Sequence, residues 1–183
     1  MKVKKLSKGL VIAISLGALL LGATTYSAVS KPANLVMAAN GATLLATQAS
    51  GVTVTPLAPV AQFDEIHTKA RSGDWMTQIK TKGESDLHVV QVTIQPGGTL
   101  GWHSHQGPSF VIVKSGTATI YDADDPTCTP DVIPTGSSLF EPAGHVHIVR
   151  NEGSEPLVNV VVQLIPVGAP RLIPELSPGN CPF

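Results

Sequence analysis

Seven short segments rich in β-branched residues dominate the chain between residues 75 and 165. Glycine, proline, aspartate or serine separates them, which is typical of β-strands joined by turns. Within one segment Val90, Val92 and Ile94 alternate with Val89, Gln91 and Thr93, as in a strand with one buried face. No apolar stretch with a helical period follows the N-terminal region. The pattern predicts an all-β sandwich or small barrel with strands at Trp75–Lys80, Leu87–Gln95, Ser109–Lys114, Thr117–Tyr121, Ser137–Glu141, Val146–Arg150 and Leu157–Ile165.

Four of the six histidines lie in two short stretches of this region, GWHSHQGPS and AGHVHIV. Residues i and i+2 of a strand face the same way, so His103 and His105 can point into one cavity, and so can His145 and His147. Two imidazoles from one strand and one from a neighbour supply three nitrogen ligands, as in many catalytic metal sites. A single His-X-His pair is a weak indication of a metal, but two pairs framed by glycine and proline are a stronger one.

The surroundings of these histidines resemble the two sequence motifs of the cupin superfamily. GGTLGWHSHQGPSFVIVKSG is similar to the first motif and GSSLFEPAGHVHIVRN to the second. The matching residues are Gly97, His103, His105 and Gly116, then Gly136, Pro142, Gly144, His147 and Asn151. The resemblance covers about residues 79–165 and implies a jelly-roll β-barrel with a metal inside. In most cupins three histidines and one glutamate hold the ion, which implies His103, His105 and His147 as ligands here.

Ser109 stands where the resemblance places the glutamate. A serine hydroxyl is neutral and a weak ligand, so three imidazoles would leave the charge of a divalent ion uncompensated. We therefore expect iron, zinc, copper, nickel or cobalt rather than manganese, and vacant positions for a chelating ligand. Ser109 would then contact the histidine ligands and not the metal itself. A degenerate barrel that binds no metal is the alternative.

Three further side chains are candidates for a role near this site. His145 is a fourth metal ligand, a proton donor and acceptor beside the metal, or a solvent-facing turn residue, and Glu141 is the nearest carboxylate in sequence. Glu141 could move a proton or replace the missing acid, although its place before the Pro142 turn predicts a position at the rim. His88 shares a face with Val90 and either lines the cavity or lies in the interior.

Trp102 alternates with the histidines and is expected on the outside of the barrel or at a subunit contact, while Phe110 and Phe140 are expected in the core.

The N-terminal region has the features of an export signal. Lys2, Lys4, Lys5 and Lys8 precede an apolar run, and Ala28-Val29-Ser30 offers small residues for cleavage. Cleavage removes four lysines and no acid, which takes the net charge from −1 to −5. An acidic chain poor in aromatic residues argues against nucleic acid and anionic membranes as partners. An uncleaved anchor is the alternative, and only that form would attach to a membrane.

The predicted organisation is a signal segment at 1–30, a linker or outer strand at 31–61, the barrel at 62–168 and a proline-rich tail at 169–183. Cys128 and Cys181 form a candidate disulfide in an oxidising compartment. The first functional hypothesis is a metal-dependent enzyme, dioxygenase-like or Lewis-acid, acting on a small organic substrate. A non-enzymatic module that binds or senses a metal or small ligand is the second, and an empty structural barrel the third. We also expect a homodimer, because Trp102 and the uncharged segment before Phe63 would expose apolar surface.

Overall fold

The computed structural model describes residues 36–37, 43–44 and 48–183. In these residues all regular structure is β, as predicted, and no helix is long and apolar enough to cross a membrane. The expected signal segment lies outside the described residues. The strands are β1 (Val36–Met37), β2 (Thr43–Leu44), β3 (Ser50–Pro56), β4 (Ala61–Phe63), β5 (His67–Ser72), β6 (Trp75–Lys80), β7 (Ser85–Ser104), β8 (Ser109–Ser115), β9 (Thr117–Asp122), β10 (Asp131–Pro134), β11 (Ser138–Glu141), β12 (His147–Arg150), β13 (Leu157–Pro166) and β14 (Ile173–Pro174).

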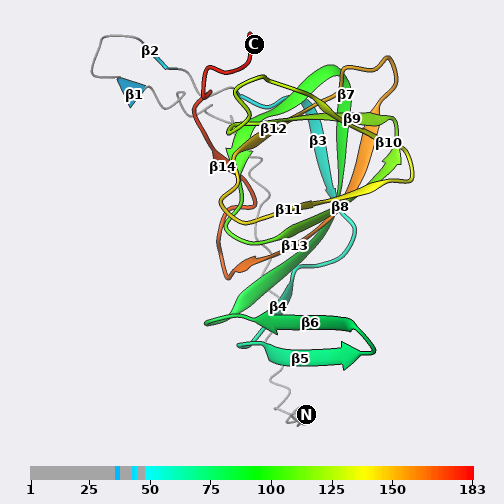
Figure 1. Cartoon of the computed structure of the whole chain (residues 1–183), viewed down its shortest axis with the longest axis vertical. Helices are drawn as coiled ribbons and strands as arrows, with labels where there is room; N and C mark the ends of the chain where they lie inside the picture. Colours follow the sequence, from blue (N-terminus) through cyan, green and yellow to red (C-terminus); the bar gives the residue numbers. More distant parts are fainter. Residues whose placement is uncertain (1–35, 38–42, 45–47) are drawn as a thin grey trace, which may run out of the picture. The chain divides into compact units, whose positions relative to one another are not determined.

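Ten of these strands form one sheet that curls into a nearly closed barrel (Figure 1). Its main path runs β10-β9-β12-β7-β13-β8-β11, and β3, β4 and β14 also pair with β7. The N-terminal half of β7 pairs with β13, and its C-terminal half pairs with β12. The long strand therefore passes from one side of the barrel to the other near Gly97 and Gly98. Asn151 fastens this bend, because its amide donates to the carbonyl of Ile94 and its backbone N–H to that of Gly98.

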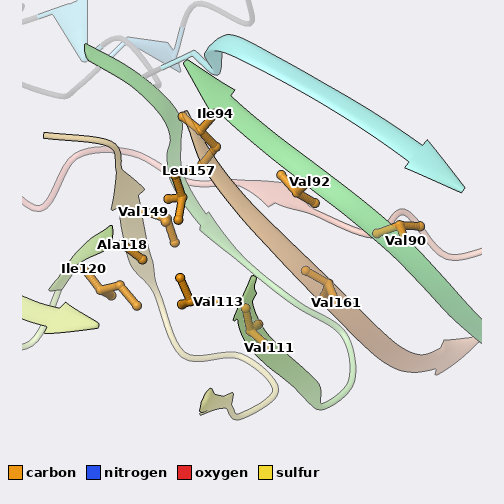
Figure 2. Close-up of a cluster of buried hydrophobic side chains, with 10 residues drawn as sticks. All are labelled: Val90, Val92, Ile94, Val111, Val113, Ala118, Ile120, Val149, Leu157 and Val161. Carbon is orange, nitrogen blue, oxygen red and sulfur yellow. The ribbon is translucent and has the colours of Figure 1, made fainter. Parts of the chain in front are cut away.

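The barrel interior is filled mainly by β-branched side chains at alternate positions of its strands. Figure 2 shows this core, which contains Val90, Val92, Ile94, Val111, Val113, Ala118, Ile120, Val149, Leu157 and Val161. Burying one such valine or isoleucine stabilises a fold by about 1.5–3 kcal/mol. Phe110 and Phe140 do not belong to this core, contrary to expectation. They lie on the outer faces of β8 and β11, exposed and with ring centroids 5.1 Å apart.

A second apolar cluster lies on the outer side of β7, beneath the C-terminal tail. Trp102, Ile148 and Tyr121 pack there against Cys181. Trp102 does face away from the histidines, but our expectation that it is exposed or at a subunit contact is wrong, since its exposed fraction is 0%. The tail covers it, because the backbone N–H of Glu175 donates to the Trp102 carbonyl at 2.9 Å.

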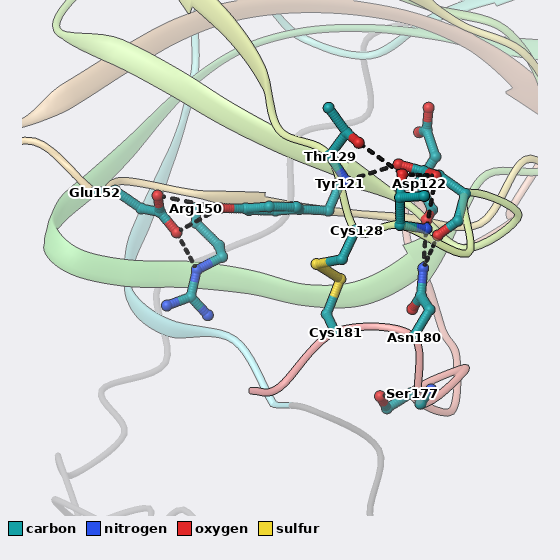
Figure 3. The surroundings of a disulfide bond; sticks show 12 residues. Tyr121, Asp122, Cys128, Thr129, Arg150, Glu152, Ser177, Asn180 and Cys181 are labelled. Atoms are coloured by element: carbon teal, nitrogen blue, oxygen red, sulfur yellow. Dashed lines mark hydrogen bonds and ion pairs between the residues drawn. A yellow bond between two sulfur atoms is a disulfide. The ribbon is translucent and has the colours of Figure 1, made fainter.

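The tail is attached to the barrel by a disulfide bond between Cys128 and Cys181, which confirms the predicted pair (Figure 3). Asn180 adds two hydrogen bonds, from its side-chain N–H groups to the carbonyls of Asp122 and Asp125. Earlier in the tail, β14 pairs with His103 and Ser104 of β7. The tail is thus held directly against the strand that carries two of the candidate ligands.

Strands β5 and β6 form a hairpin that pairs only with itself. Nearly every residue in it is exposed, including Trp75, Met76 and Ile79. Strand β6 matches the predicted Trp75–Lys80 segment, whereas β5 was not predicted. Its sequence, HTKARS, has only one β-branched residue, Thr68, and no Phe, Tyr or Trp, so it gives little of the signal by which strands are recognised.

Candidate metal centre

Three histidines from two adjacent strands meet inside the barrel. His147 at the start of β12 pairs directly with His103 of β7, and His105 follows one residue after β7 ends. Their exposed fractions are 2% for His103, 3% for His105 and 1% for His147. Their ring centroids lie 4.4–5.3 Å apart.

The turn before β12 sets the register that brings His147 to this point. Gly144 occupies the left-handed region, with φ of 75°, which a residue with a Cβ rarely adopts. Its backbone N–H donates to the carbonyl of His105 at 2.8 Å. The two histidine stretches are therefore joined by a backbone hydrogen bond as well as by strand pairing.

The Nδ1 atom of each imidazole is hydrogen-bonded to a backbone carbonyl. Nδ1 of His103 lies 2.8 Å from the carbonyl oxygen of Gly101, Nδ1 of His105 lies 2.9 Å from that of Arg171, and Nδ1 of His147 lies 3.1 Å from that of His145. A carbonyl only accepts, so each Nδ1 carries the proton. In the neutral rings the lone pair is then on Nε2. Such hydrogen bonds fix the tautomer and orientation of metal-binding histidines.

Glu141 adds a carboxylate to this group, and the expectation that it lies at the rim is wrong. Its exposed fraction is 7%. One oxygen lies 3.1 Å from Nε2 of His105, and the other lies 3.3 Å from Nε2 of His147. These separations suit hydrogen bonds, but their direction does not, and both Nε2 atoms lack a hydrogen-bond partner. The carboxylate is therefore close to both imidazoles without a well-aligned hydrogen bond to either of them.

The position of Glu141 follows from the pairing of β11 with β8. Glu141 pairs directly with Ser109, the residue that stands where cupins usually carry their glutamate. Residues directly opposite in an antiparallel pair project from the same face of the sheet. The carboxylate therefore enters the barrel from the adjacent strand instead of from β8. Alternation along β11 was the available signal, since Leu139 and Glu141 are two residues apart and both face inward.

Ser109 lies behind the group of ligands. It is fully buried and accepts a hydrogen bond from Nε2 of Gln163 at 2.9 Å. The same Nε2 atom lies 3.0 Å from Nδ1 of His105. Ser109 is thus linked to His105 through Gln163, and its role as a residue that supports the ligands stays a prediction.

Burial and neighbouring charges shift the pKa values of His103, Glu141 and His147. Burial, reinforced by His147, lowers the pKa of His103 to about 3. Burial alone would raise the pKa of Glu141, but contact with His105 and His147 outweighs it and holds that pKa well below its usual range. Burial likewise opposes the charge on His147, yet contact with Glu141 raises its pKa. A proton and a metal ion would both bind Nε2 of His147, so the two compete for this atom.

These residues fit a divalent metal. Ligand nitrogens of His103, His105 and His147 all lie within 4.8 Å of one another and are buried. Two of the three Nε2 atoms have no partner, and an unpartnered buried polar atom costs about 1–3 kcal/mol. Three imidazoles could give a metal three nitrogen ligands and leave positions open, and the carboxylate of Glu141 lies beside two of them.

The sequence places this barrel among known proteins. Residues 90–163 match the family model described as Cupin domain. The chain contains a cupin domain. The match spans the strands from β7 to β13, including all three histidines and Glu141.

Solved structures share the fold of this cupin at low sequence identity. A cupin superfamily protein from Desulfitobacterium hafniense is 16% identical, with a TM-score of 0.42 over 62% of this chain and 77% of that one. A predicted oxalate decarboxylase from Thermotoga maritima is 20% identical, with a TM-score of 0.37 over 46% and 83%. The DMSP lyase DddQ from Ruegeria pomeroyi is 20% identical, with a TM-score of 0.42 over 48% and 42%. No curated protein matches the chain.

Beside the ligands the cupin barrel holds a small cavity of about 30 Å³. Its walls are mostly apolar, and the tail residues Arg171 and Leu172 help to line it. The polar side chains on its wall include Asn159 and Gln163 of β13. Our sequence interpretation missed both, although they interrupt the buried face formed by Leu157, Val161 and Ile165. Arg171 carried no signal, because it precedes the short β14 and belongs to no strand pattern.

His145 lies at a separate opening of about 150 Å³ that Glu141 and His147 also line. Its ring stacks on His147 with centroids 5.9 Å apart. Its nitrogens lie 3.8 Å from Asp122 and 3.7 Å from Asp124, and about a third of its side chain is exposed. The structure therefore places His145 at the entrance and outside the ligand group.

His88 is not part of the histidine group. It is half-buried on β7, paired with Gln163 of β13, and its Nε2 has no hydrogen-bond partner. The cavity-lining residues do not include it.

Proposed function

We propose that this cupin domain binds one divalent metal through His103, His105, His147 and Glu141 and uses it to act on a small organic substrate outside the cytoplasm. One observation carries the proposal. Nε2 of His105 and Nε2 of His147 are buried without hydrogen-bond partners, 3.1–3.3 Å from the two oxygens of Glu141. Such an arrangement costs free energy unless a cation occupies the space between these atoms.

Each residue has a distinct part in this proposal. A bound metal would supply Lewis-acid polarisation, or electron transfer if it is redox-active. The Nδ1 hydrogen bonds hold the imidazoles in the ligating tautomer, and Glu141 supplies the anionic charge that three neutral imidazoles lack. Arg171 and Leu172 exclude bulk water from the cavity. His145 can exchange a proton with a ligand at the entrance, because Asp122 and Asp124 lie beside its ring.

The position of Glu141 also changes which metals we propose. The expectation against manganese depended on the absence of a carboxylate at residue 109. Glu141 supplies an oxygen anion to the same site, so that argument no longer holds. We propose iron, zinc, copper, nickel, cobalt or manganese, with the choice left to metal supply in the compartment.

Metal titration of the purified, metal-free protein tests the site. Wild type should bind about one equivalent, and His147→Ala should bind at least about 100-fold more weakly, because loss even of residues behind the ligands costs about 10–100-fold. His67→Ala, on the exposed hairpin, is the matched control and should bind like wild type. The proposed site is wrong if wild type binds none of the six metals or if His147→Ala binds normally.

A non-enzymatic binding or sensing module is the second candidate. The cavity volume of about 30 Å³ favours it, since such a space holds about two waters and no large substrate. Oxygen uptake and product analysis with catechols, flavonols and diketones separate the two functions. Turnover by wild type that His147→Ala lacks would support an enzyme. Metal binding without turnover or oxygen uptake would support the binding module.

Export is part of the proposal. The disulfide between Cys128 and Cys181 suits an oxidising compartment, and the first residues have the composition of a signal peptide. N-terminal sequencing of protein recovered outside the cytoplasm should begin near Lys31. Retention of Met1 would favour the membrane-anchored form instead.

A further inference from the structure

The cavity beside the candidate metal centre is lined by an arginine that forms no ion pair among the described residues, although Glu141 lines the same cavity. Arg171 lies in the tail, where its carbonyl accepts the hydrogen bond from His105 Nδ1. Its side chain is half-buried, and its Nε is buried without a hydrogen-bond partner. Among the described residues no carboxylate forms an ion pair with it; Arg150, in contrast, pairs with Glu152 at 2.9 Å. A partly desolvated guanidinium without an anion is unfavourable.

Other polar groups of the cavity also lack partners. Oδ1 of Asn159 and Oε1 of Gln163 are buried and unpartnered, and both side chains line the cavity with Arg171. An amide can turn by half a revolution and present its N–H group instead of its oxygen. The wall beside the metal centre therefore offers the guanidinium Nε and the amide of Asn159, whose Oδ1 is unpartnered, whereas the amide of Gln163 already donates to Ser109.

The charges favour an anion in this space. The proposed site contains a divalent cation, the anionic Glu141, three neutral imidazoles and the cationic Arg171. Burial lowers the pKa of Arg171 and Glu141 raises it, but an arginine remains charged at neutral pH. The loaded site then has two positive charges in excess, inside a barrel where charge is poorly screened.

The size of the cavity limits that anion. A volume of about 30 Å³ accommodates about two waters, so only the smallest anions fit without displacement of the wall. The remaining lining is aliphatic and includes Val92, Val111 and Val161. A small carboxylate has both features, since it joins an anionic end to a short apolar one.

We propose that this cavity binds a small carboxylate, of the size of formate or acetate, and that Arg171 is its anion-binding residue. The inference rests on the proposed metal site, because the cation supplies part of the excess positive charge. Asn159 donates to the second carboxylate oxygen after rotation of its amide. A larger carboxylate would bind only with displacement of the tail segment that carries Arg171 and Leu172.

Isothermal titration calorimetry of the zinc-loaded protein with sodium acetate tests this inference. Acetamide is the neutral control of equal size, and benzoate is the larger anion. Acetate should bind, and the other two should bind at least about tenfold more weakly. Arg171→Gln should weaken acetate binding at least about tenfold, because a hydrogen bond to a charged group is worth about 1.5–3 kcal/mol. Arg171→Lys should retain part of the affinity.

Two measurements separate this inference from the proposed metal site. Zinc affinity of Arg171→Gln should stay within about threefold of wild type, because the guanidinium is not a ligand. Arg71→Gln, on the exposed hairpin, is the matched control and should change neither titration. Thermal melts show whether each variant is folded.

The outcomes are distinguishable. Equal acetate affinity in wild type and folded Arg171→Gln, or equal affinity for acetate and acetamide, would overturn the role of Arg171. Equal affinity for benzoate would overturn the assignment to a small carboxylate. A protein that takes up no zinc but binds acetate through Arg171 would overturn the proposed metal site and leave this inference standing. A protein that binds neither overturns both.

Discussion

At the residue scale, the candidate metal centre depends on which strand supplies its carboxylate. Glu141 and Ser109 are paired on adjacent strands, and only Glu141 has its oxygens beside Nε2 of His105 and His147. Glu141→Gln keeps the shape and removes the charge. It should lower metal affinity at least about 100-fold, whereas Ser109→Ala should change it by no more than about tenfold, the lower limit for residues behind the ligands. Metal titration of both variants beside wild type measures this.

Variants that exchange Glu141 and Ser109 provide the control for these metal affinities. Glu141→Ser alone should lose metal as Glu141→Gln does. The double variant Glu141→Ser with Ser109→Glu returns the carboxylate to the position that cupins usually use, and it should recover part of the affinity. Ser109→Glu alone should not strengthen binding, because it buries a second carboxylate beside the first. Strong loss of metal in Ser109→Ala would contradict the assignment, since the serine would then act directly.

At the element scale, the turn between β7 and β8 tolerates no side chain at Gly107. A Cβ there would overlap the carbonyl oxygen of Leu164 in β13. That atom belongs to the backbone and cannot move aside. Gly107→Ala should therefore destabilise the fold by about 3 kcal/mol, at the upper end for overpacking. The midpoint of urea unfolding measures this.

Gly153→Ala is the matched control for Gly107→Ala. Its nearest neighbour would be the Asn151 side chain at 3.4 Å, which is ordinary contact. This variant should stay within about 0.5 kcal/mol of wild type. A Gly107→Ala protein as stable as the control would show that β13 can shift away from the turn.

The tail is a second element whose stability can be predicted. The disulfide joins residues 53 apart and is worth about 4 kcal/mol in the chain-entropy model. Cys128→Ser with Cys181→Ser should therefore lower the unfolding free energy by up to about 4 kcal/mol. It should also loosen the cover over Trp102, which a red shift of the tryptophan emission would report. Emission from Trp75 is a constant background, since this residue is exposed on the hairpin.

Mass spectrometry of non-reduced wild type controls this comparison by showing the loss of two hydrogens. Free thiols at both positions would contradict the bridge. A double variant as stable as wild type would show that the hydrogen bonds of Asn180 and Glu175 hold the tail without the disulfide.

At the scale of the whole molecule, exposed apolar side chains favour a homodimer. Phe110, Ile112 and Phe140 on β8 and β11 are 55%, 52% and 55% exposed. The hairpin exposes Trp75, Met76 and Ile79 as well, and an isolated two-stranded hairpin is only marginally stable. A hollow of about 510 Å³ separates β6 from Phe110 and Phe140. We expect a second copy to cover these surfaces, although Trp102 takes no part, contrary to our first argument.

Light scattering coupled to size exclusion tests the dimer. Wild type should have twice the monomer mass at micromolar concentrations, and Phe140→Lys should shift the mass toward the monomer. Val132→Lys is the matched control, because Val132 is equally exposed but lies on β10. A monomeric wild type would contradict the expected dimer. A dimeric Phe140→Lys would show that the interface lies elsewhere.

Local patterns were sufficient for the fold class and for two of the proposed ligands. Alternation with a period of two marks the strands, and the same alternation makes His103 and His105 face one cavity. The glycines and prolines around them determine turns, and turn geometry depends on nearby residues alone. The all-β fold therefore followed from local patterns, whereas the choice of His147 rather than His145 as the third ligand came from the resemblance to the second cupin motif. Strand β5, whose only β-branched residue is Thr68, did not follow from such patterns.

Tertiary structure decided the features that depend on which strands and segments lie side by side. Glu141 enters the site because β11 pairs with β8 in one register, and a shift of one residue would have turned it outward. Trp102 is buried because a tail from the far end of the chain covers it. Arg171 reaches the cavity for the same reason. Pairing register and tail packing are set by contacts among distant residues, so no pattern within a single segment contains them.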